Sequence, residues 1–298
     1  MITVSALTKH YGQRMAVDNL TFDVAPGRVT GFVGPNGAGK STTMRMMVGL
    51  TRPDCGEVRY HGISYTSLLH PARVVGSVLD ARSMHPGRTA RNHLAAAAAL
   101  SGIPSQRVEE VLHEVGLDSA ADQRTGGFSL GMRQRLALAG ALLGEPEVLL
   151  LDEPSNGLDP DGIRWLRNSL SEFANRGGTV FVSSHLIAEL AMFADDLVVV
   201  GGGKLLAAET VAATLARGDS TVVVRTAHAV ELAYVLDQHD IDVEVAGDSL
   251  SAHGTTTAVV SQIVFDHRIQ IIEITETSRS LEEILLDITG ASAEFAAA

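Results

Sequence analysis

A glycine-rich stretch near the start of the chain constrains the fold more than any other segment. Residues 34–41 read GPNGAGKS, which fits the pattern G-x-x-x-x-G-K-[ST] of a phosphate-binding loop. Glycines let the backbone curl until successive amides point into one concavity, and the lysine adds a full positive charge. The apolar run 29–33 precedes the loop, and a helical pattern over 43–50 follows it. Strand, loop and helix in this order predict a polyphosphate site rather than a glycine-rich turn with a chance lysine.

Within this loop the residue types assign separate roles. Lys40 and the loop amides are expected to hold phosphate oxygens, and the hydroxyl of Ser41 is expected to reach Mg²⁺. The helix that begins here adds about half a positive charge at its N-terminus. The full set of predicted phosphate-site residues is Gly34, Pro35, Asn36, Gly37, Ala38, Gly39, Lys40, Ser41 and Thr42.

An aromatic side chain precedes the loop in the chain. Residues 2–7 and 20–24 alternate like the strands of an edge hairpin, and the segment 9–19 is predicted to connect them. Tyr11 lies in that connection, where an aromatic ring can stack on an adenine. An ordinary turn residue is the alternative, and the loop that follows favours the stacking role.

Carboxylates follow two other apolar runs. The run 148–151 (VLLL) ends in Asp152 and Glu153. At the tip of a buried strand, Asp152 can hold the water shell of Mg²⁺ and Glu153 can polarise an attacking water, whereas the alternative is a solvated strand end. Asp80 follows the run 74–79 and is placed either to meet Mg²⁺ or its water or to cap a helix.

Two further polar residues stand at the ends of predicted elements. His185 follows the buried strand 179–183, at the same strand edge as the carboxylates, and is expected to contact a terminal phosphate. Ser129 opens the helix predicted over 130–143, where its oxygen caps the helix and the first amides can bind an anion. Simple capping is the alternative for Ser129.

Composition places the chain among ordinary globular proteins and excludes some kinds of site. Of the 298 residues, 45% are hydrophobic and 19% charged, and no apolar run approaches the roughly 20 residues that cross a bilayer. The N-terminal segment has no cleavable signal pattern, so we expect a cytoplasmic location. Cys55 is the single cysteine, which rules out an intrachain disulfide, and we expect its thiol to be buried.

The net charge of −12 is concentrated at the C-terminal end. Residues 220–298 contain 13 acidic and 3 basic side chains, against 22 and 20 in residues 1–219. Nucleic acid and anionic lipid both require a basic surface, so neither is an expected direct partner.

The pattern of elements predicts two domains with a break near residue 219. Residues 1–219 read as an α/β domain with an all-helical insert, about 84–143, made of helices at 90–100, 106–115 and 130–143. Residues 220–298 read as β-α-β-β-α-β followed by a last helix at 281–288, which is the ferredoxin-like α+β arrangement. This second domain carries no catalytic constellation, and packing, dimerisation or docking is its expected role.

These motifs together resemble the ATP-binding cassette (ABC) ATPases, a branch of the P-loop NTPase fold, over about the first 215 residues. The loop 34–41 matches Walker A and VLLLDEP at 148–154 matches Walker B. FSLGMRQR at 128–135 is similar to the family signature LSGGQ, and NGLDP at 156–160 is similar to its D-loop. SLGMRQRLALA, DEPSNGLDP and SSHL, with the acidic extension, resemble the bacterial drug- and antibiotic-exporting branch, whose ATPase and membrane subunits are separate chains.

The resemblance implies roles for the matching residues. Tyr11 would stack on adenine, Asp152 would be the Walker B acid, Glu153 the catalytic base and His185 the switch histidine. Ser129 and Gly131 would bind the γ-phosphate of ATP held by a second subunit, with Asp159 communicating across the same interface. Asp80 stands where the family has its Q-loop glutamine, and Leu130 and Met132 replace the first glycine and the glutamine of the signature.

The family further implies a cycle, with ATP and Mg²⁺ as substrate and cofactor. Two ATP molecules would hold two copies in a head-to-tail dimer, and hydrolysis would release it. Such a chain would be the energising subunit of an export complex, bound to a multi-spanning permease on the inner face of the membrane. A soluble ABC ATPase acting on nucleic acid or the ribosome, and a regulatory nucleotide-binding module, are the alternatives.

Overall fold

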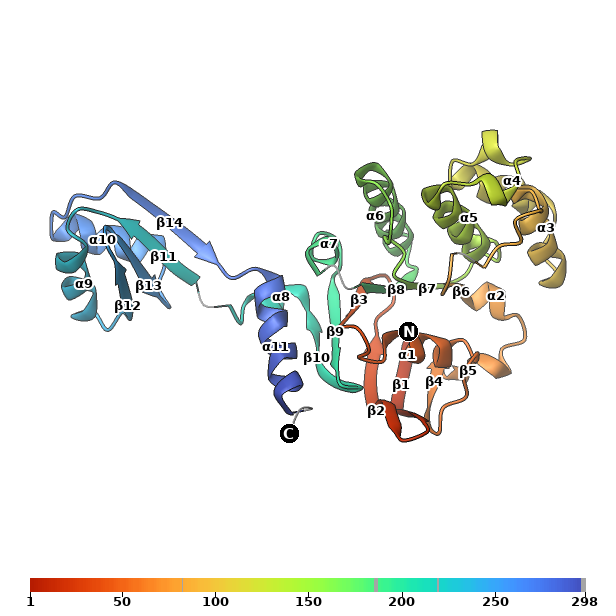
Figure 1. The fold of residues 1–298 in the computed structure, drawn as a ribbon, viewed down its shortest axis with the longest axis horizontal. Helices are drawn as coiled ribbons and strands as arrows, with labels where there is room; N and C mark the ends of the chain where they lie inside the picture. The colour runs from red at the N-terminus through yellow and green to blue at the C-terminus, as the bar shows by residue number, and fades with distance from the viewer. Residues whose placement is uncertain (82, 185–186, 219, 296–298) are drawn as a thin grey trace. The chain divides into compact units, whose positions relative to one another are not determined.

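The structure is a computed structural model that describes residues 1–81, 83–184, 187–218 and 220–295. The chain divides into two compact units, residues 1–211 with 287–298, and residues 212–286 (Figure 1). In the part of the chain that the structure describes, no helix is long and apolar enough to cross a membrane.

The first unit contains an antiparallel sheet of four strands in the order β2-β1-β4-β5. Its alternating side chains put apolar residues on one face, as expected for a sheet with one covered side. The strands are β1 (Ile2–Tyr11), β2 (Arg14–Val24), β4 (Cys55–Tyr60) and β5 (Ile63–Ser64).

A second sheet of six strands has the order β10-β9-β3-β8-β7-β6. All pairs are parallel except β9 with β10, and the central strands are apolar throughout, since parallel sheets are buried on both faces. The strands are β3 (Val29–Val33), β6 (Val75–Val78), β7 (Val148–Asp152), β8 (Thr179–Ser184), β9 (Asp196–Gly201) and β10 (Lys204–Thr210).

The main core lies between these two sheets. Phe22 of β2 packs on Phe32 of β3 and Phe181 of β8, with ring centroids 5.9 and 5.8 Å away. Helix α1 (Lys40–Met47) adds Met44 and Met47, both fully buried, to the same cluster. This packing holds the start of α1 at the carboxyl edge of the parallel sheet, where ligands bind in open α/β sheets.

The helical insert has its own core. Helices α3 (Ala90–Leu100), α4 (Gln106–Glu114) and α5 (Leu130–Leu142) pack through buried side chains such as Leu94, Leu112 and Leu136, and Figure 1 shows them grouped together. The three predicted helices are confirmed. The other helices of this unit are α2 (Pro71–Val74), α6 (Pro160–Asn175) and α7 (Ile187–Ala191), with the short 3-10 turns η1 (Tyr65–Ser67), η2 (Asp118–Ala120) and η3 (Thr125–Gly127).

The second unit is a four-stranded antiparallel sheet in the order β12-β13-β11-β14, whose apolar face packs on two helices. In chain order the elements run β-α-β-β-α-β, the split arrangement of ferredoxin-like domains. They are β11 (Ser220–Arg225), α9 (Ala229–Asp237), β12 (Val243–Ala246), β13 (Ser249–His253), α10 (Thr257–Asp266) and β14 (Glu273–Ser278), with α8 (Val211–Leu215) before them and α11 (Leu281–Phe295) after them.

Three local predictions were wrong. The segment 9–19 is mostly strand, because β1 and β2 continue past their irregular register to a tight turn at Gly12. The last helix runs to Phe295 rather than 288, because a single glycine such as Gly290 costs a helix only about 1 kcal/mol relative to alanine and does not end it here. Cys55 is exposed rather than buried, because it is the first residue of β4, where the chain leaves a surface turn.

Candidate functional site

The glycine-rich loop joins β3 to α1 and passes very close to two neighbouring strands. A Cβ on Gly39, whose φ is 102°, would lie 2.5 Å from the carbonyl oxygen of Ala16. A Cβ on Gly34 would overlap the carbonyl oxygen of Val200. Only glycine fits at these two positions. The close approach places the loop amides beside the N-terminus of α1, and the N-terminus of a helix favours anions.

Lys40 is the first residue of α1 and is folded back over its own loop. It is only 7% exposed, and its Nζ donates to the carbonyl oxygens of Gly34 at 2.7 Å and Pro35 at 3.3 Å. Burial lowers the pKa of this amine, whereas the nearby carboxylates of Glu153 and Asp152 act in the opposite direction. The ammonium group of Lys40 is therefore held inside the loop by two carbonyl oxygens of the same loop.

The two carboxylates at the end of β7 are positioned by the neighbouring strand β8. Ser183, paired with Asp152 in the parallel register, donates its hydroxyl to Asp152 Oδ1 at 2.5 Å. The hydroxyl oxygen of Ser183 also accepts from the backbone amide of Glu153 at 3.0 Å. Glu153 has a φ of 50°, a left-handed conformation that costs about 1–3 kcal/mol and clusters at functional sites.

These elements surround one cleft of about 560 Å³ at the carboxyl edge of the sheet. Its volume is within the usual range for small-molecule sites. The structure brings together many of the predicted site residues there, from the β1–β2 hairpin, the loop with α1, and the end of β7: Tyr11, Asn36, Gly37, Gly39, Lys40, Ser41, Thr42 and Glu153.

Tyr11 lies at the hairpin end of this cleft. Its ring is half exposed, and Lys9 Nζ lies 5.7 Å from the ring centroid. An exposed ring beside a phosphate loop offers a face on which a flat base can stack.

The oxygens present fit a magnesium ion. Mg²⁺ in nucleotide sites takes one or two protein oxygens plus phosphate oxygens and water, so a closed cage of protein ligands is not required. The exposed hydroxyl of Ser41 and the fixed carboxylate of Asp152 provide oxygens of that kind. Among the described residues no group of three or more His, Cys, Asp or Glu side chains gathers as a complete metal site.

Other predicted site residues lie elsewhere in the described chain. Ser129 caps α5 by accepting from the amide of Met132 at 3.2 Å, and Asp159 caps α6 by accepting from that of Gly162 at 2.7 Å. Gly131 lies in the first turn of α5, and the exposed Asp80 lies two residues beyond β6. None of these four lines the cleft. His185 lies outside the described residues.

Four residues at this site were not predicted. Arg14, Ala16 and Asn156 line the cleft, and Arg14 Nη2 lies 3.5 Å from the carbonyl oxygen of Gly37. Ser183, on the neighbouring strand β8, orients Asp152 and Glu153 through its hydrogen bonds to both. For Ser183, the signal in the sequence was a serine at the end of the apolar strand TVFVS. For Asn156, the signal was its position three residues after Glu153.

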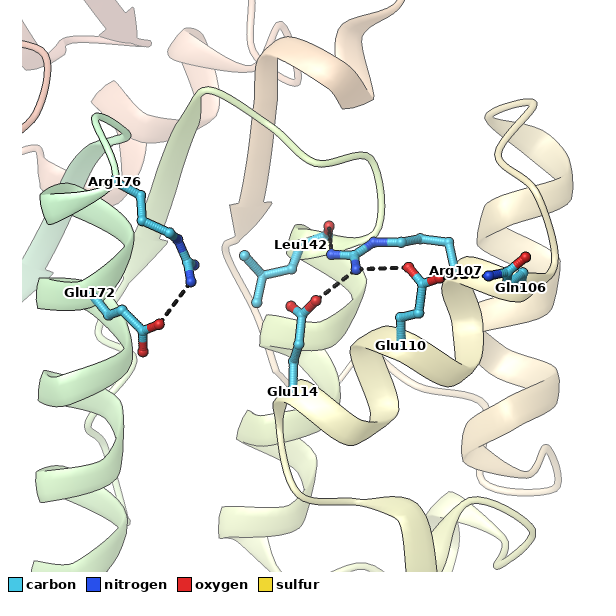
Figure 2. Close-up of polar contacts among 7 residues, drawn as sticks. All are labelled: Gln106, Arg107, Glu110, Glu114, Leu142, Glu172 and Arg176. Atoms are coloured by element: carbon cyan, nitrogen blue, oxygen red, sulfur yellow. Dashed lines mark hydrogen bonds and ion pairs between the residues drawn. The ribbon is translucent and has the colours of Figure 1, made fainter.

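A larger cavity, of about 700 Å³, lies between α4, α5 and α6. Arg107, Glu114, Glu172 and Arg176 are among the residues that line it. Figure 2 shows their polar contacts: Arg107 Nη1 donates to Glu114 at 2.6 Å and to the neighbouring Glu110 at 3.2 Å, and Arg176 Nη1 donates to Glu172 at 2.8 Å. Arg107 Nη2 also donates to the carbonyl oxygen of Leu142 near the end of α5, at 3.3 Å. Because these charges already compensate one another, the cluster is structural and the cleft at the loop is the candidate site.

Comparison with known proteins agrees with the geometry of this cleft. A family profile described as "ABC transporter" matches residues 17–156, and a profile described as a domain of unknown function matches residues 220–282. The bacitracin transport ATP-binding protein BcrA of Bacillus licheniformis is 34% identical, over 97% of this chain and 97% of its own length. The ABC transporter ATP-binding protein YhcH of Bacillus subtilis is also 34% identical, over 99% and 97%.

A third relative and a solved structure extend this comparison. The Nod factor export ATP-binding protein I of a Rhizobium species is 31% identical over 98% of both chains. The ATP-binding subunit of an ABC transporter has a TM-score of 0.66 at 26% identity, covering 73% of this chain and 92% of its own. The sequence relatives are therefore similar through the C-terminal unit as well, whereas the structural similarity covers less of this chain.

Proposed function

Since this chain belongs to the family of ABC transporter ATP-binding proteins, we propose that it is the ATP-hydrolysing subunit of a transporter that exports its substrate through a separate membrane permease. The observation that carries the proposal is the cleft in which Lys40, Ser41 and Glu153 converge. Relatives over nearly the full chain are named for bacitracin transport and for Nod factor export. An export role, with a drug, antibiotic or lipid-like substrate, extends those names to this chain.

In the proposed binding step, the cleft takes ATP with its base at the hairpin and its phosphates on the loop. Tyr11 stacks on the adenine, and Lys40 exchanges the carbonyls of Gly34 and Pro35 for phosphate oxygens. Ser41 and Asp152 would hold Mg²⁺, and Asp80, which follows the neighbouring strand β6, would offer a further oxygen. The metal supplies positive charge next to the phosphate oxygens.

In the proposed chemical step, Glu153 acts as the general base. It accepts a proton from a water whose oxygen attacks the γ-phosphorus, while the bond from that phosphorus to the bridging oxygen breaks. Negative charge develops on the leaving phosphates, where Lys40 and the loop amides stabilise it. His185 is proposed to contact the terminal phosphate.

We further propose that a second copy completes the site. Ser129 and Gly131 begin α5 and Asp159 caps α6, and none of them lines the chain's own cleft. Their amides and side chains are then available to a γ-phosphate held by another chain, in a head-to-tail dimer. Loss of the γ-phosphate removes the contacts that hold the dimer closed, and the opening is transmitted to the permease.

The domain roles follow from the same proposal. Residues 1–219 form the nucleotide-binding domain, with the helical insert at about 84–143, and residues 220–298 form an accessory domain for packing, dimerisation or docking. The accessory domain is acidic, with 13 acidic and 3 basic side chains, and so is unsuited to nucleic acid. The chain would act at the cytoplasmic face of the membrane, held there by the permease.

The test is to tag the Glu153→Gln chain in its own host, separate membranes from cytosol, and identify what co-purifies from each fraction with ATP present. Recovery of a multi-spanning protein from the membrane fraction supports the export role. Recovery from the cytosol alone, with ribosomes or nucleic acid, contradicts it. The matched control is Lys40→Ala, which should lose nucleotide binding and with it any ATP-dependent partner.

A further inference from the structure

Strand β1 loses its regular pairing just before Tyr11. Its register with β2 shifts on both sides of Lys9, and its pairing with β4 ends at Thr8, opposite Cys55. Beyond that point the described pairing with β4 offers the strand no further backbone partner, and a strand end with few partners opens easily. The position of Tyr11 therefore depends on contacts besides those of the sheet.

Asp54, in the loop before β4, takes the place of a partner strand there. Its Oδ2 accepts from the backbone amide of His10 at 2.6 Å, and its Oδ1 accepts from Lys9 Nζ at 2.8 Å. Its own backbone amide donates to the carbonyl oxygen of Thr8 at 2.9 Å. A single residue thus contacts three consecutive residues of β1, immediately before Tyr11.

The side chain of Asp54 makes these contacts as a charged group. The hydrogen bond from Lys9, and then that from the amide of His10, lowers the pKa of Asp54 to about 2, so the carboxylate is ionised at neutral pH. Hydrogen bonds to an ionised group are shorter and roughly twice as strong as those between neutral groups. An ionised carboxylate is therefore a suitable anchor for an irregular strand end.

Lys9 links this anchor to the ring of Tyr11. The two residues are two positions apart on the strand, so their side chains leave the same face. Lys9 Nζ lies over the ring, 5.7 Å from its centroid, which is within the distance of a cation–π contact. Because Asp54 binds the ammonium group, one face of the ring carries a fixed cation and the other face is left for a flat base.

We propose that Asp54 positions the ring of Tyr11 for the base of the nucleotide, through Lys9 and the backbone of His10. This rests on the proposed function, because Tyr11 is there the ring on which adenine stacks. Asp54 is not among the described residues that line the cleft, so it acts through β1 and not by touching the nucleotide. Its effect is consequently confined to the base, since the phosphates are bound by the loop around Lys40, on a separate element.

The first test follows the ring itself and needs no nucleotide. The full chain, which has four tyrosines, is labelled with 3-fluorotyrosine, and the fluorine resonance of Tyr11 is identified by its loss in Tyr11→Phe. That resonance should shift in Asp54→Asn and in Lys9→Met, which keeps the apolar part of the side chain. Glu57→Gln, the matched control, removes an exposed ion pair with Arg59 on β4 and should leave the resonance unchanged. A Tyr11 resonance that stays in place in Asp54→Asn overturns the proposal.

The second test compares two ligands in buffer without Mg²⁺: ATP, and inorganic tripolyphosphate, which has the phosphates but no base. Competition with a fluorescent nucleotide gives both affinities. Asp54→Asn should bind ATP about three- to tenfold more weakly, within the range found for residues in one hydrogen-bond network, and should bind tripolyphosphate like the parent. In a Tyr11→Ala background it should cause no further loss of ATP affinity. Equal losses for both ligands, or the same loss with and without the Tyr11 ring, contradict the positioning role.

Turnover with Mg²⁺ gives a third readout. Asp54→Asn should raise the KM for ATP and leave kcat unchanged, because stacking of the base is the same in the ground state and in the transition state. A lowered kcat at unchanged KM contradicts the proposal, because a base-positioning residue does not act on the chemical step.

These measurements separate the positioning role from the proposed function. If ATP moves the Tyr11 resonance of the parent chain but Asp54→Asn does not, the positioning role alone fails. If ATP binds the parent no more tightly than tripolyphosphate and leaves that resonance in place, the base does not lie at Tyr11. The nucleotide site of the proposed function then fails, and the role of Asp54 in base binding fails with it.

Discussion

The hydroxyl of Ser183 donates a 2.5 Å hydrogen bond to Oδ1 of Asp152, across two adjacent strands. Ser183 is fully buried, and its oxygen also accepts from the amide of Glu153 at 3.0 Å. A single side chain therefore fixes both the proposed magnesium carboxylate and the backbone of the proposed base. Groups that orient a ligand in this way typically contribute 10–100-fold to metal affinity or activity.

Ser183→Ala is accordingly expected to reduce ATP turnover by about 10–100-fold and to raise the Mg²⁺ concentration needed for half-maximal rate. ATP binding without metal should be unchanged, because the loop and Tyr11 are untouched. A magnesium titration of turnover measures this. The matched control is Ser169→Ala, which removes a hydroxyl bonded to the carbonyl of Trp165 on α6. An unchanged magnesium dependence in Ser183→Ala would exclude the orienting role.

Tyr11→Ala should weaken ATP binding roughly tenfold or more, because base-to-aromatic stacking contributes about 1–3 kcal/mol per base. Tyr11→Phe keeps the ring and should bind ATP like the parent chain. Competition with a fluorescent nucleotide gives both affinities. Parent-like affinity in Tyr11→Ala would show that the base lies elsewhere.

The lowered pKa of Lys40 predicts that nucleotide binding is coupled to proton uptake. Burial lowers the pKa of its amine below the ordinary 10.5 in the free chain, and phosphate oxygens would raise it again. Binding should therefore take up protons in alkaline buffer, between the lowered pKa and 10.5, and none at neutral pH from this group. Calorimetry in two buffers of different ionisation enthalpy counts the protons. Lys40→Arg, which stays charged, should abolish the alkaline uptake, and a persistent uptake would assign it to another group.

The lowered pKa of Lys40 also makes the stability of the folded chain depend on pH. A lysine with a lowered folded-state pKa binds fewer protons in the folded chain than in the unfolded chain across that alkaline window. The free energy of unfolding contributed by Lys40 therefore rises with pH there, until both states are neutral. Denaturant unfolding of the parent and Lys40→Met across alkaline pH should show this difference, and parallel pH profiles would contradict it.

The ion pairs in Figure 2 should contribute unequally to stability. Arg107 is 15% exposed and bonds to Glu110, Glu114 and the carbonyl of Leu142, so Arg107→Met should cost roughly 1–3 kcal/mol. Arg176 is 64% exposed with one partner, and Arg176→Ala should cost about 0–1 kcal/mol. Denaturant unfolding compares the two. Equal losses in the free energy of unfolding would mean that burial does not decide how much each ion pair contributes. ATP binding should stay unchanged in both variants.

The loop and the carboxylates were predictable because their chemistry is local. The loop GPNGAGKS contains its glycines, lysine and serine within residues 34–41, and VLLLDE at 148–153 indicates a strand followed by two carboxylates. The helices of the insert were predictable for the same reason, since their apolar spacing is contained in each segment. The fold class is confirmed by the two sheets and by the similarity to ABC ATPase structures.

The residues that were missed depend on register between distant segments. Ser183 faces Asp152 only because β7 and β8 pair in parallel with those residues opposite each other. Arg14 reaches the cleft only because the β1–β2 hairpin is longer than its alternation predicts. The hydrogen bond from the amide of His10 to Asp54 joins residues 44 positions apart, and nothing in either short segment encodes it.

The most direct test of the central claim is phosphate release by the purified chain and by Glu153→Gln, each saturated with ATP and Mg²⁺. The parent should turn over, and Glu153→Gln should bind ATP as tightly but hydrolyse it about 10²–10⁴-fold more slowly, the usual contribution of a general base. Undiminished hydrolysis by Glu153→Gln would remove Glu153 from its catalytic role and contradict the mechanism.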